Sequence, residues 1–237
     1  MSALADAYAH CEAILREADR DRWLAALFAP AELRPDLHAL GAFSAAISHI
    51  SELVREPLAG ELRLTWWLEA LSGERAGEAA GNPVCTGFAE TLRRRSIPWT
   101  WIERRLMQER DSLYQAGGER VTGFAYSVAA FILNGGEDTA ATECANLAGD
   151  AETALRHAVG EPGMTLAGAA SFDDALDLLD AASREAHHLA ARLWPAFAGL
   201  AALQLDAIRG GKGKPPTAPW RRQFAIWRWM HRRVRRA

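Results

Sequence analysis

The chain has 237 residues, of which 49% are hydrophobic and 24% are charged, and its formal net charge is −3 at pH 7. This composition is typical of a soluble globular protein, and no run of about 18 apolar residues predicts a membrane span. The N-terminus is acidic and amphipathic, so we do not expect it to be a secretion signal. The cysteines are scattered and form no Cys-x-x-Cys pair, which argues against a disulfide framework or a zinc site and favours a cytoplasmic location.

Apolar residues recur at every third or fourth position along most of the chain, which predicts helices. We expect them at residues 3–18, 35–54, 60–72, 84–95, 99–115, 121–133, 138–158, 172–193 and 195–208. Prolines and glycines separate these segments, and no segment has the alternation of a strand, so no sheet is expected. Residues 124–133 are apolar nearly all round, which predicts a helix buried among others. The expected organisation is one all-α domain over residues 1–209, a linker over 210–219 and a basic amphipathic helix over 220–237.

The segment from Asp19 to Leu71 carries the most specific information. It contains the strings DRDRWLAALFAP, LRPDLHALGAFSAAISHISELVREP and LAGELRLTWWLEAL. These strings resemble the squalene/phytoene synthase family, the head-to-head prenyl transferases of the all-α isoprenoid-synthase fold. They look most like the branch of short bacterial relatives and complex I assembly factors. The resemblance implies an isoprenoid-synthase-like helical bundle, truncated in its second half because residues 160–170 form a much shorter stretch than in the family.

The chemistry of that family needs magnesium ions, which bridge a diphosphate to aspartate-rich motifs on two helices. At the first motif position this chain reads Ser-His-Ile-Ser-Glu, and at the second it has two acidic residues that are not spaced by four. Because magnesium prefers oxygen ligands, the residues at these two motif positions are poorly suited to bind it. The degenerate motif positions are Ser48, His49, Glu52, Asp150 and Glu152. We therefore expect no catalytic residue, no metal and no cofactor, and Mg²⁺ only if a rearranged site keeps prenyl transferase activity.

The string SFDDALDLLD at residues 171–180 contains a literal D-D-x-x-D motif of the kind that holds magnesium in prenyl-diphosphate enzymes. It lies outside both family motif positions. Ser171 followed three residues later by Asp174 has the spacing of a capping box, and acidic residues in a first helical turn suit the helix dipole. We therefore predict a capped helix start here, not a metal site.

Several polar and aromatic residues near the resemblance could line a ligand cavity. They are Glu52, Arg55, Glu61, Arg63, Trp66 and Asp111. The alternative is that the charges form ordinary pairs along helix faces and that Trp67 belongs to the core. For Glu109 and Asp111, on one helical stretch, a solvated face is the favoured interpretation.

The C-terminal stretch PWRRQFAIWRWMHRRVRRA is the second informative segment. From Arg209 to the end, the chain has ten Lys or Arg and no Asp or Glu. Aromatic residues recur there at spacings of four and three, which predicts one apolar stripe on a basic helix. Such a helix suits an anionic membrane or a protein partner; packing against the bundle is the alternative, and nucleic acid is disfavoured because no nucleic-acid motif accompanies it. The predicted surface comprises Trp220, Arg221, Arg222, Phe224, Trp227, Arg228, Trp229, Arg232 and Arg233.

Three functional hypotheses follow. The leading one is a non-catalytic member of the family, cytoplasmic or peripheral on the inner membrane, that binds a protein partner or a prenyl lipid. The second is an active head-to-head prenyl transferase with a rearranged magnesium site. The third is one subunit of a hetero-oligomeric prenyl synthase whose partner supplies the carboxylates.

Overall fold

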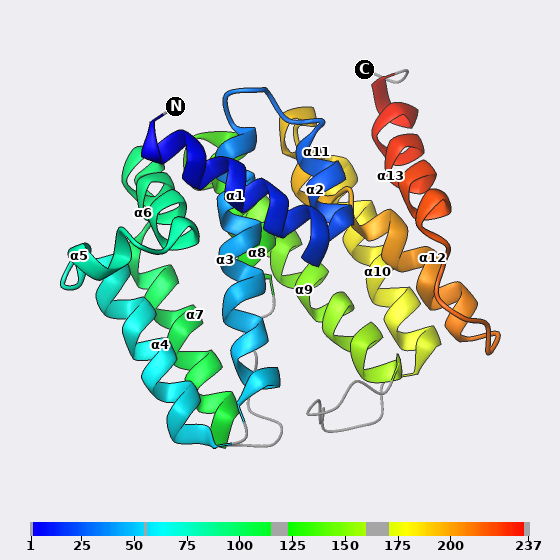
Figure 1. Cartoon of the computed structure of the whole chain (residues 1–237). Helices are drawn as coiled ribbons and strands as arrows, with labels where there is room; N and C mark the ends of the chain where they lie inside the picture. The colour runs from blue at the N-terminus through cyan, green and yellow to red at the C-terminus, as the bar shows by residue number, and fades with distance from the viewer. Residues whose placement is uncertain (1, 55, 115–122, 160–170, 235–237) are drawn as a thin grey trace. The chain divides into compact units, whose positions relative to one another are not determined.

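The computed structural model describes residues 2–54, 56–114, 123–159 and 171–234, and at residues 51, 52 and 232–234 it describes the backbone only. The α-helices are α1 (Ala3–Ala18), α2 (Arg20–Ala26), α3 (Arg34–Leu53), α4 (Pro57–Ser72), α5 (Ala76–Ala79), α6 (Pro83–Arg95), α7 (Trp99–Tyr114), α8 (Phe124–Asn134), α9 (Thr139–Val159), α10 (Phe172–His188), α11 (Trp194–Phe197), α12 (Leu200–Gly210) and α13 (Pro219–Val234), with a 3₁₀ helix η1 at Ala191–Leu193 (Figure 1). Over this described part the chain has no strand, so the predicted all-α class is confirmed.

Most helix bounds lie within a few residues of those predicted, but the short helices α2 and α5 were not predicted, and the predicted helix at 195–208 is divided into α11 and α12. A further difference lies near residue 190. The sequence predicts one helix over 172–193, but α10 ends at His188, and Leu189 is extended with φ −72° and ψ 158°. The Leu189 carbonyl leaves the helical ladder and accepts a hydrogen bond from the Trp194 indole Nε1 at 3.1 Å. A tertiary hydrogen bond of this kind has no periodic signature, which is why the sequence pattern did not show this break.

The chain divides into two compact units, which we describe separately. Unit 1 comprises residues 1–23 and 31–121, and unit 2 comprises residues 24–30 and 122–237. The short segment 24–30 therefore packs with the second half of the chain, although it lies within the segment that carries the family resemblance.

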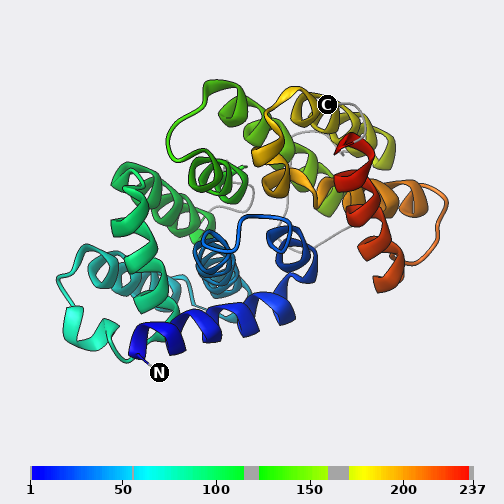
Figure 2. The same cartoon turned by 90° about the horizontal axis from the view of Figure 1, so that it is seen from above.

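Unit 1 is built around α3, which packs against α1, α6 and α7 (Figures 1 and 2). Phe43 on α3 stacks on Phe88 of α6 with ring centroids 4.1 Å apart and meets the edge of Trp67 from α4 at 5.5 Å. The predicted core position of Trp67 is confirmed, because it is 7% exposed. A Cβ atom on Gly41 would lie 2.5 Å from the end of the Leu15 side chain of α1, so a larger residue at position 41 would force Leu15 to shift.

A buried acid joins three helices of unit 1. Asp36, at the start of α3, is fully buried and accepts hydrogen bonds from Arg94 at 2.7 Å and Arg95 at 2.6 Å, both at the end of α6. Thr91 and Tyr8 donate further hydrogen bonds to the same carboxylate at 3.1 and 3.3 Å. Because a buried charge is tolerated only when it is paired and hydrogen-bonded, this cluster fixes α1, α3 and α6 together.

Unit 2 has α9 and α10 packed along their length, with α8 on α9 and α12 on α10. Both long helices bury alanines, whose small side chains let helix axes approach closely. These alanines, all fully buried, include Ala145, Ala148, Ala151, Ala175, Ala182 and Ala186. Helix α8 is buried at most of its positions, including the run from Val128 to Leu133, which confirms the prediction of a helix apolar nearly all round.

The D-D-x-x-D string forms the first turns of α10. The Ser171 hydroxyl accepts a hydrogen bond from the Asp174 backbone N–H at 3.1 Å, and the Asp174 carboxylate accepts one from the Ser171 N–H at 2.8 Å. This is a complete capping box, as predicted. The hydrogen bonds from Ser171, its backbone N–H first, lower the pKa of Asp174, which is exposed like Asp173 and Asp177. Asp173 and Asp174 of this string therefore serve the helix start.

Candidate functional site

The first motif position lies near the end of α3, facing an arginine. The Ser48 hydroxyl accepts a hydrogen bond from Arg105 Nη2 of α7 at 3.2 Å, and Arg105 Nη1 is paired with Glu109 at 2.7 Å. His49 is exposed, and the side chain of Glu52 lies outside the described residues. Arg105 and Glu109 are 13% and 8% exposed in their side chains, so this is a partly desolvated ion pair beside the motif. A guanidinium at this point would repel a divalent cation.

Glu109 was predicted on a solvated face, and this prediction was wrong, because the residue is only 7% exposed. The sequence held a signal for its burial. Ile102, Leu106 and Glu109 are spaced by four and three, which places them on one face of α7, and the first two are buried. Burial of the acid is tolerated because Arg105 stands one turn earlier and neutralises it.

The second motif position lies on α9, in unit 2. Glu152 accepts a hydrogen bond from the Tyr126 hydroxyl at 2.9 Å and another from Arg156 Nη2 at 2.6 Å. Asp150 is exposed. Both oxygens of Glu152 are thus engaged by donors of its own unit, and a metal ion would have to displace Arg156. Within the described ranges, no three His, Cys, Asp or Glu side chains form a group that could hold a metal ion.

The predicted cavity residues on α4 and α7 lie at the surface of unit 1 or outside the described part. Glu61 accepts a hydrogen bond from the Tyr114 hydroxyl at 2.5 Å, which links α4 to α7 and raises the pKa of Tyr114. Trp66 donates to Glu78 at 3.2 Å. Arg63 is exposed, the Asp111 side chain is 61% exposed beside Arg110, and Arg55 lies outside the described residues.

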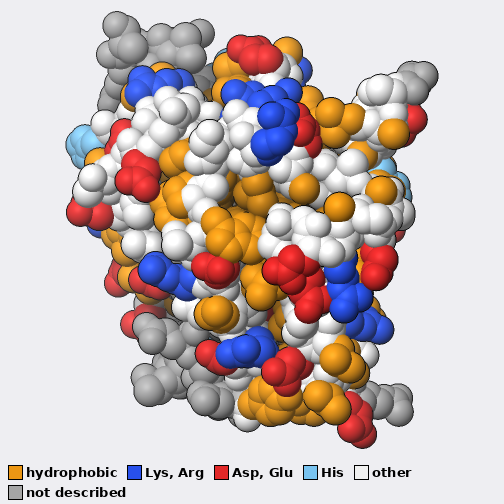
Figure 3. Space-filling model, turned by 90° about the vertical axis from the view of Figure 1, so that its left-hand side faces the viewer, with side chains coloured by type: hydrophobic (Ala, Val, Ile, Leu, Met, Phe, Trp, Pro, Cys, Tyr) orange, Lys and Arg blue, Asp and Glu red, His pale blue; other side chains and the backbone are white. Residues whose placement is uncertain are grey.

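The side of unit 1 that carries α4, α5 and α6 has charges of both signs interspersed with hydrophobic side chains (Figure 3). Among the hydrophobic residues of α4, Leu58 and Leu62 are 62% and 64% exposed. A mixed surface of this kind is ordinary for a solvated protein face.

Helix α13 has two apolar faces, and only one of them is covered. Its buried face consists of Ile226, Trp229 and Met230, which are 1%, 8% and 9% exposed. The stripe predicted from the sequence is the other face, which we call the aromatic stripe: Trp220, Phe224 and Trp227 are 63%, 54% and 49% exposed. Trp229, included in the predicted surface, therefore lies on the buried face. Arg232 and Arg233 have side chains outside the described part of the structure.

Contacts within unit 2 hold α13 in place. Asp206 on α12 forms an ion pair with Arg222 and accepts a hydrogen bond from the Thr217 N–H at 2.7 Å. Trp229 stacks on His187 of α10 with centroids 5.0 Å apart and donates to the Ser183 hydroxyl. The helix is thus anchored on one side while the aromatic stripe faces outward.

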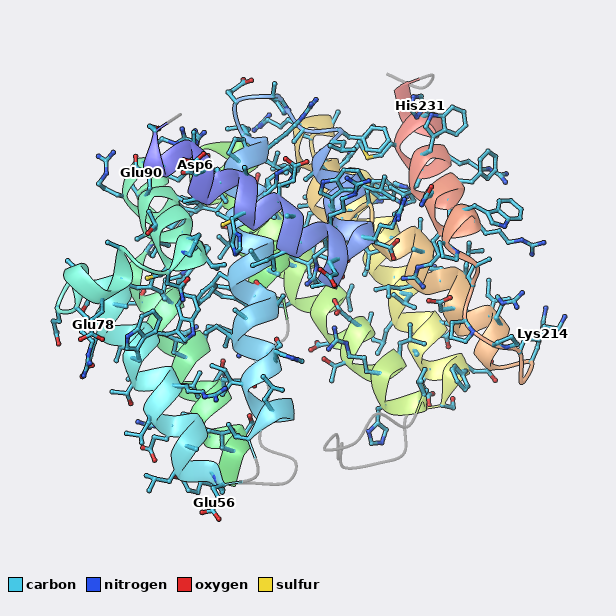
Figure 4. The ribbon with its side chains drawn as sticks, viewed as in Figure 1. Asp6, Glu56, Glu78, Glu90, Lys214 and His231 are labelled. Atoms are coloured by element: carbon cyan, nitrogen blue, oxygen red, sulfur yellow. The ribbon has the colours of Figure 1, made fainter. Side chains whose placement is uncertain are left out.

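The aromatic stripe continues as a stack along the helix. Phe224 and Trp227 have ring centroids 5.7 Å apart, and Trp227 and His231 have centroids 4.4 Å apart. Figure 4 labels His231 near the end of α13, where its ring also meets the edge of Phe28 at 5.8 Å. The stacking orders the exposed rings, so less side-chain entropy would be lost when they contact another surface.

Comparison with known proteins shows what the chain is related to. Residues 15–115 match the family model of squalene/phytoene synthase. This match covers less than half of the chain, and within it the chain resembles the squalene/phytoene synthase family. The match includes the first motif position and the Arg105–Glu109 pair, so both lie within the segment that carries the family signal.

Among curated proteins, the chain is similar to complex I assembly factor 6 of several mammals. It is 26% identical to the rat protein over 106 residues, which is 45% of this chain and 32% of the relative, and 26% identical to the bovine protein over 102 residues, or 43% and 30%. It is 24% identical to the human protein over 102 residues, with the same coverage as the bovine match. The matches thus span about a third of the length of these relatives.

Among solved structures, the chain is similar in fold to the squalene synthase HpnC from Alicyclobacillus acidocaldarius. The TM-score is 0.63, the sequence identity is 17%, and the superposition covers 96% of this chain and 95% of that one. The fold predicted from the family resemblance is therefore confirmed. The predicted truncation falls at residues 160–170, which lie outside the described residues. Among the described helices, none is long and apolar enough to cross a membrane.

Proposed function

We propose that this chain is a non-catalytic squalene/phytoene synthase-like protein that associates with an anionic membrane surface through α13. The observation that carries the proposal is the aromatic stripe, which stays exposed on a helix whose opposite face is anchored in unit 2. Exposed aromatic rings beside arginines are the side chains that favour the headgroup region of a bilayer.

The charge of α13 supports an anionic surface. Arg221 and Arg228 are exposed on the helix, and Arg221 lies over the Trp220 ring at 5.0 Å. The helix carries no acidic residue, whereas the rest of the chain is acidic. Each Lys or Arg near an anionic bilayer contributes about 1 kcal/mol of attraction, so the arginines and the rings act together.

The non-catalytic part of the proposal is supported by the two motif positions. Each places its polar residue in a hydrogen bond with an arginine of its own unit: Ser48 with Arg105, and Glu152 with Arg156. A catalytic magnesium site needs oxygen ligands that are free of such cations. The similarity to proteins named as assembly factors favours assistance to a protein partner at the membrane over turnover of a prenyl substrate.

Co-sedimentation with vesicles tests the membrane part. A Phe224→Ala/Trp227→Ala variant should bind vesicles of phosphatidylcholine and phosphatidylglycerol at least roughly tenfold more weakly than the natural chain, since burial of one such ring is worth about 1.5–3 kcal/mol. The matched control is Leu58→Ala/Leu62→Ala, which removes equally exposed side chains from α4. Binding should also weaken with salt and fail on pure phosphatidylcholine. Equal binding by both double variants would overturn the membrane role.

Incubation of the purified chain with farnesyl diphosphate and Mg²⁺ tests the non-catalytic part. We expect no release of diphosphate. Sustained release by the isolated chain would show a rearranged active site and overturn this part, whereas release only after addition of a co-purifying synthase-like protein would favour a hetero-oligomeric enzyme.

A further inference from the structure

Unit 2 contains a groove where α10, α12 and α13 meet, with a volume of about 1280 Å³. This exceeds the usual range of about 300–1,000 Å³ for small-molecule pockets, so the groove can accept a long ligand. Helices α10 and α13 contribute its charged residues and most of its rings, and α12 contributes Ala201, Gln204 and Leu205. We call it the α13 groove.

Two tryptophans that line the α13 groove have their indole N–H groups engaged in hydrogen bonds. Trp229 donates its indole N–H to Ser183 at 3.3 Å, and Trp194 donates its own to the Leu189 carbonyl at 3.1 Å. The two indole rings meet edge to face at 6.4 Å. Ala201 and Leu205 of α12 also line the groove. With the indole N–H groups engaged, the wall offers hydrocarbon and ring faces, which favours an apolar occupant.

The charged groups of the α13 groove are mostly cationic. Arg184 of α10 and Arg221 and Arg228 of α13 line it, and its one carboxylate, Asp180, accepts a hydrogen bond from Gln204 at 2.8 Å. Arg184 and Arg228 form no ion pair with any side chain in the described part of the chain. Three guanidinium groups against one engaged carboxylate favour an anionic group with several acceptor oxygens, such as a phosphate.

The α13 groove adjoins the surface proposed to meet the membrane. Trp220 and Phe224 belong both to the aromatic stripe and to the groove lining. When the stripe lies among lipid headgroups, the groove therefore borders the same lipids. A lipid could enter from the bilayer without crossing water, which lowers the cost of moving its acyl chain.

We propose that the α13 groove binds one anionic phospholipid of that membrane, with the phosphate held by Arg184 and Arg228 and an acyl chain against Trp194 and Trp229. This deepens the proposed function, on which it rests for the source of the lipid. The lipid would complete the contact of α13 with the bilayer and give it a preference for anionic headgroups beyond general charge attraction.

Titration of the full chain with dihexanoyl phosphatidylglycerol below its micelle concentration tests the groove without a membrane. Tryptophan fluorescence should report saturable binding, because Trp194 and Trp229 line the groove. Dihexanoyl phosphatidylcholine should bind more weakly, and glycerol phosphate or inorganic phosphate should bind far more weakly because they lack the chain. Equal binding of inorganic phosphate, or equal binding of phosphatidylcholine, would overturn the proposal.

Two variants locate the site. Arg184→Gln removes an exposed cation and should weaken phosphatidylglycerol binding at least roughly tenfold, as expected for loss of a charged hydrogen bond. Arg63→Gln, which changes another exposed arginine, on α4, is the matched control and should leave phosphatidylglycerol binding unchanged. Ala225→Trp should block the groove by filling it. Unchanged binding in both groove variants, with folding verified by circular dichroism, would overturn the site.

The two proposals fail separately. Loss of vesicle binding with intact short-chain lipid binding would remove the membrane role and leave the groove. Vesicle binding that depends on the aromatic stripe, with no saturable binding of the short-chain lipid, would leave the membrane role and overturn the groove.

Discussion

Asp36 is a single residue whose contacts connect several helices of unit 1. Its carboxylate is fully buried and joins α1, α3 and α6 through Tyr8, Thr91, Arg94 and Arg95. The two arginine side chains are 40% and 24% exposed, so each can regain water if the acid is lost. The cluster therefore stabilises unit 1 by placing one charge among many donors, not by isolating a pair from solvent.

Replacement of this acid should be costly. We expect Asp36→Ala to lower the free energy of unfolding by about 3 kcal/mol, the low end for a broken buried ion pair, because both arginines reach water. Glu90→Ala, which breaks the exposed pair with Arg93, is the control and should hardly change the free energy of unfolding. Urea denaturation measures both. A loss for Asp36→Ala no greater than that of the control would contradict the structural role of the cluster.

His38, two residues along α3, should make stability depend on pH. Burial lowers the pKa of His38, against the opposing effect of Glu12, whose carboxylate lies 3.8 Å from Nδ1, and with a further lowering by Arg34. The unfolded chain takes up the proton near the ordinary pKa of about 6.5, whereas the folded chain resists it. Stability is therefore fully present above that pH and falls as the pH drops toward the folded pKa.

The measurement is chemical denaturation between pH 7.5 and 5.5, compared for the natural chain and His38→Gln. The variant should show a shallower loss of stability on acidification. His10→Gln, at an exposed position of α1, should keep the natural slope. Identical slopes for the natural chain and the His38 variant would rule out His38 as the source.

At the scale of the element, α13 carries one buried tryptophan, Trp229, and one exposed tryptophan, Trp227. Trp229 is packed between His187 and Trp194, whereas Trp227 stacks on Phe224 and His231 at the surface. We expect Trp229→Ala to cost about 3–5 kcal/mol of stability, as for a large core side chain, and Trp227→Ala to leave it nearly unchanged. Thermal unfolding decides between them. Similar losses for the two variants would mean that α13 does not bury the face described.

At the scale of the whole molecule, the thiols report on both units. Burial raises the pKa of Cys11 and Cys85 in unit 1 to about 11 and that of Cys144 in unit 2 to about 12. Thiolates are the reactive form, so all three should resist a thiol reagent at neutral pH and react after unfolding in urea. Rapid labelling of one cysteine in the native chain, located by mass spectrometry, would identify a unit that opens locally.

Much of the fold could be predicted from sequence because helix formation is local. The spacing of apolar residues placed most helices, and the Ser171–Asp174 spacing identified a capping box in what otherwise resembled a metal motif. The contacts at the candidate site were harder to predict from the sequence. Arg105 lies 57 residues from Ser48, and no sequence period connects them. The burial of Glu109 was missed because its charge was weighed above its helical phase.

The sequence by itself determined the helical class, the family resemblance and a basic aromatic helix at the C-terminus, since each depends on residues close together in the chain. Only the tertiary structure decided which face of that helix is covered. Ile226, Trp229 and Met230 form one apolar face and Trp220, Phe224 and Trp227 another. A helix on the surface of a bundle can bury only one face, and the choice depends on the surface made by α10 and α12 and on the Asp206–Arg222 anchor. Because the face with Ile226, Trp229 and Met230 packs against α10 and α12, the aromatic stripe remains at the surface.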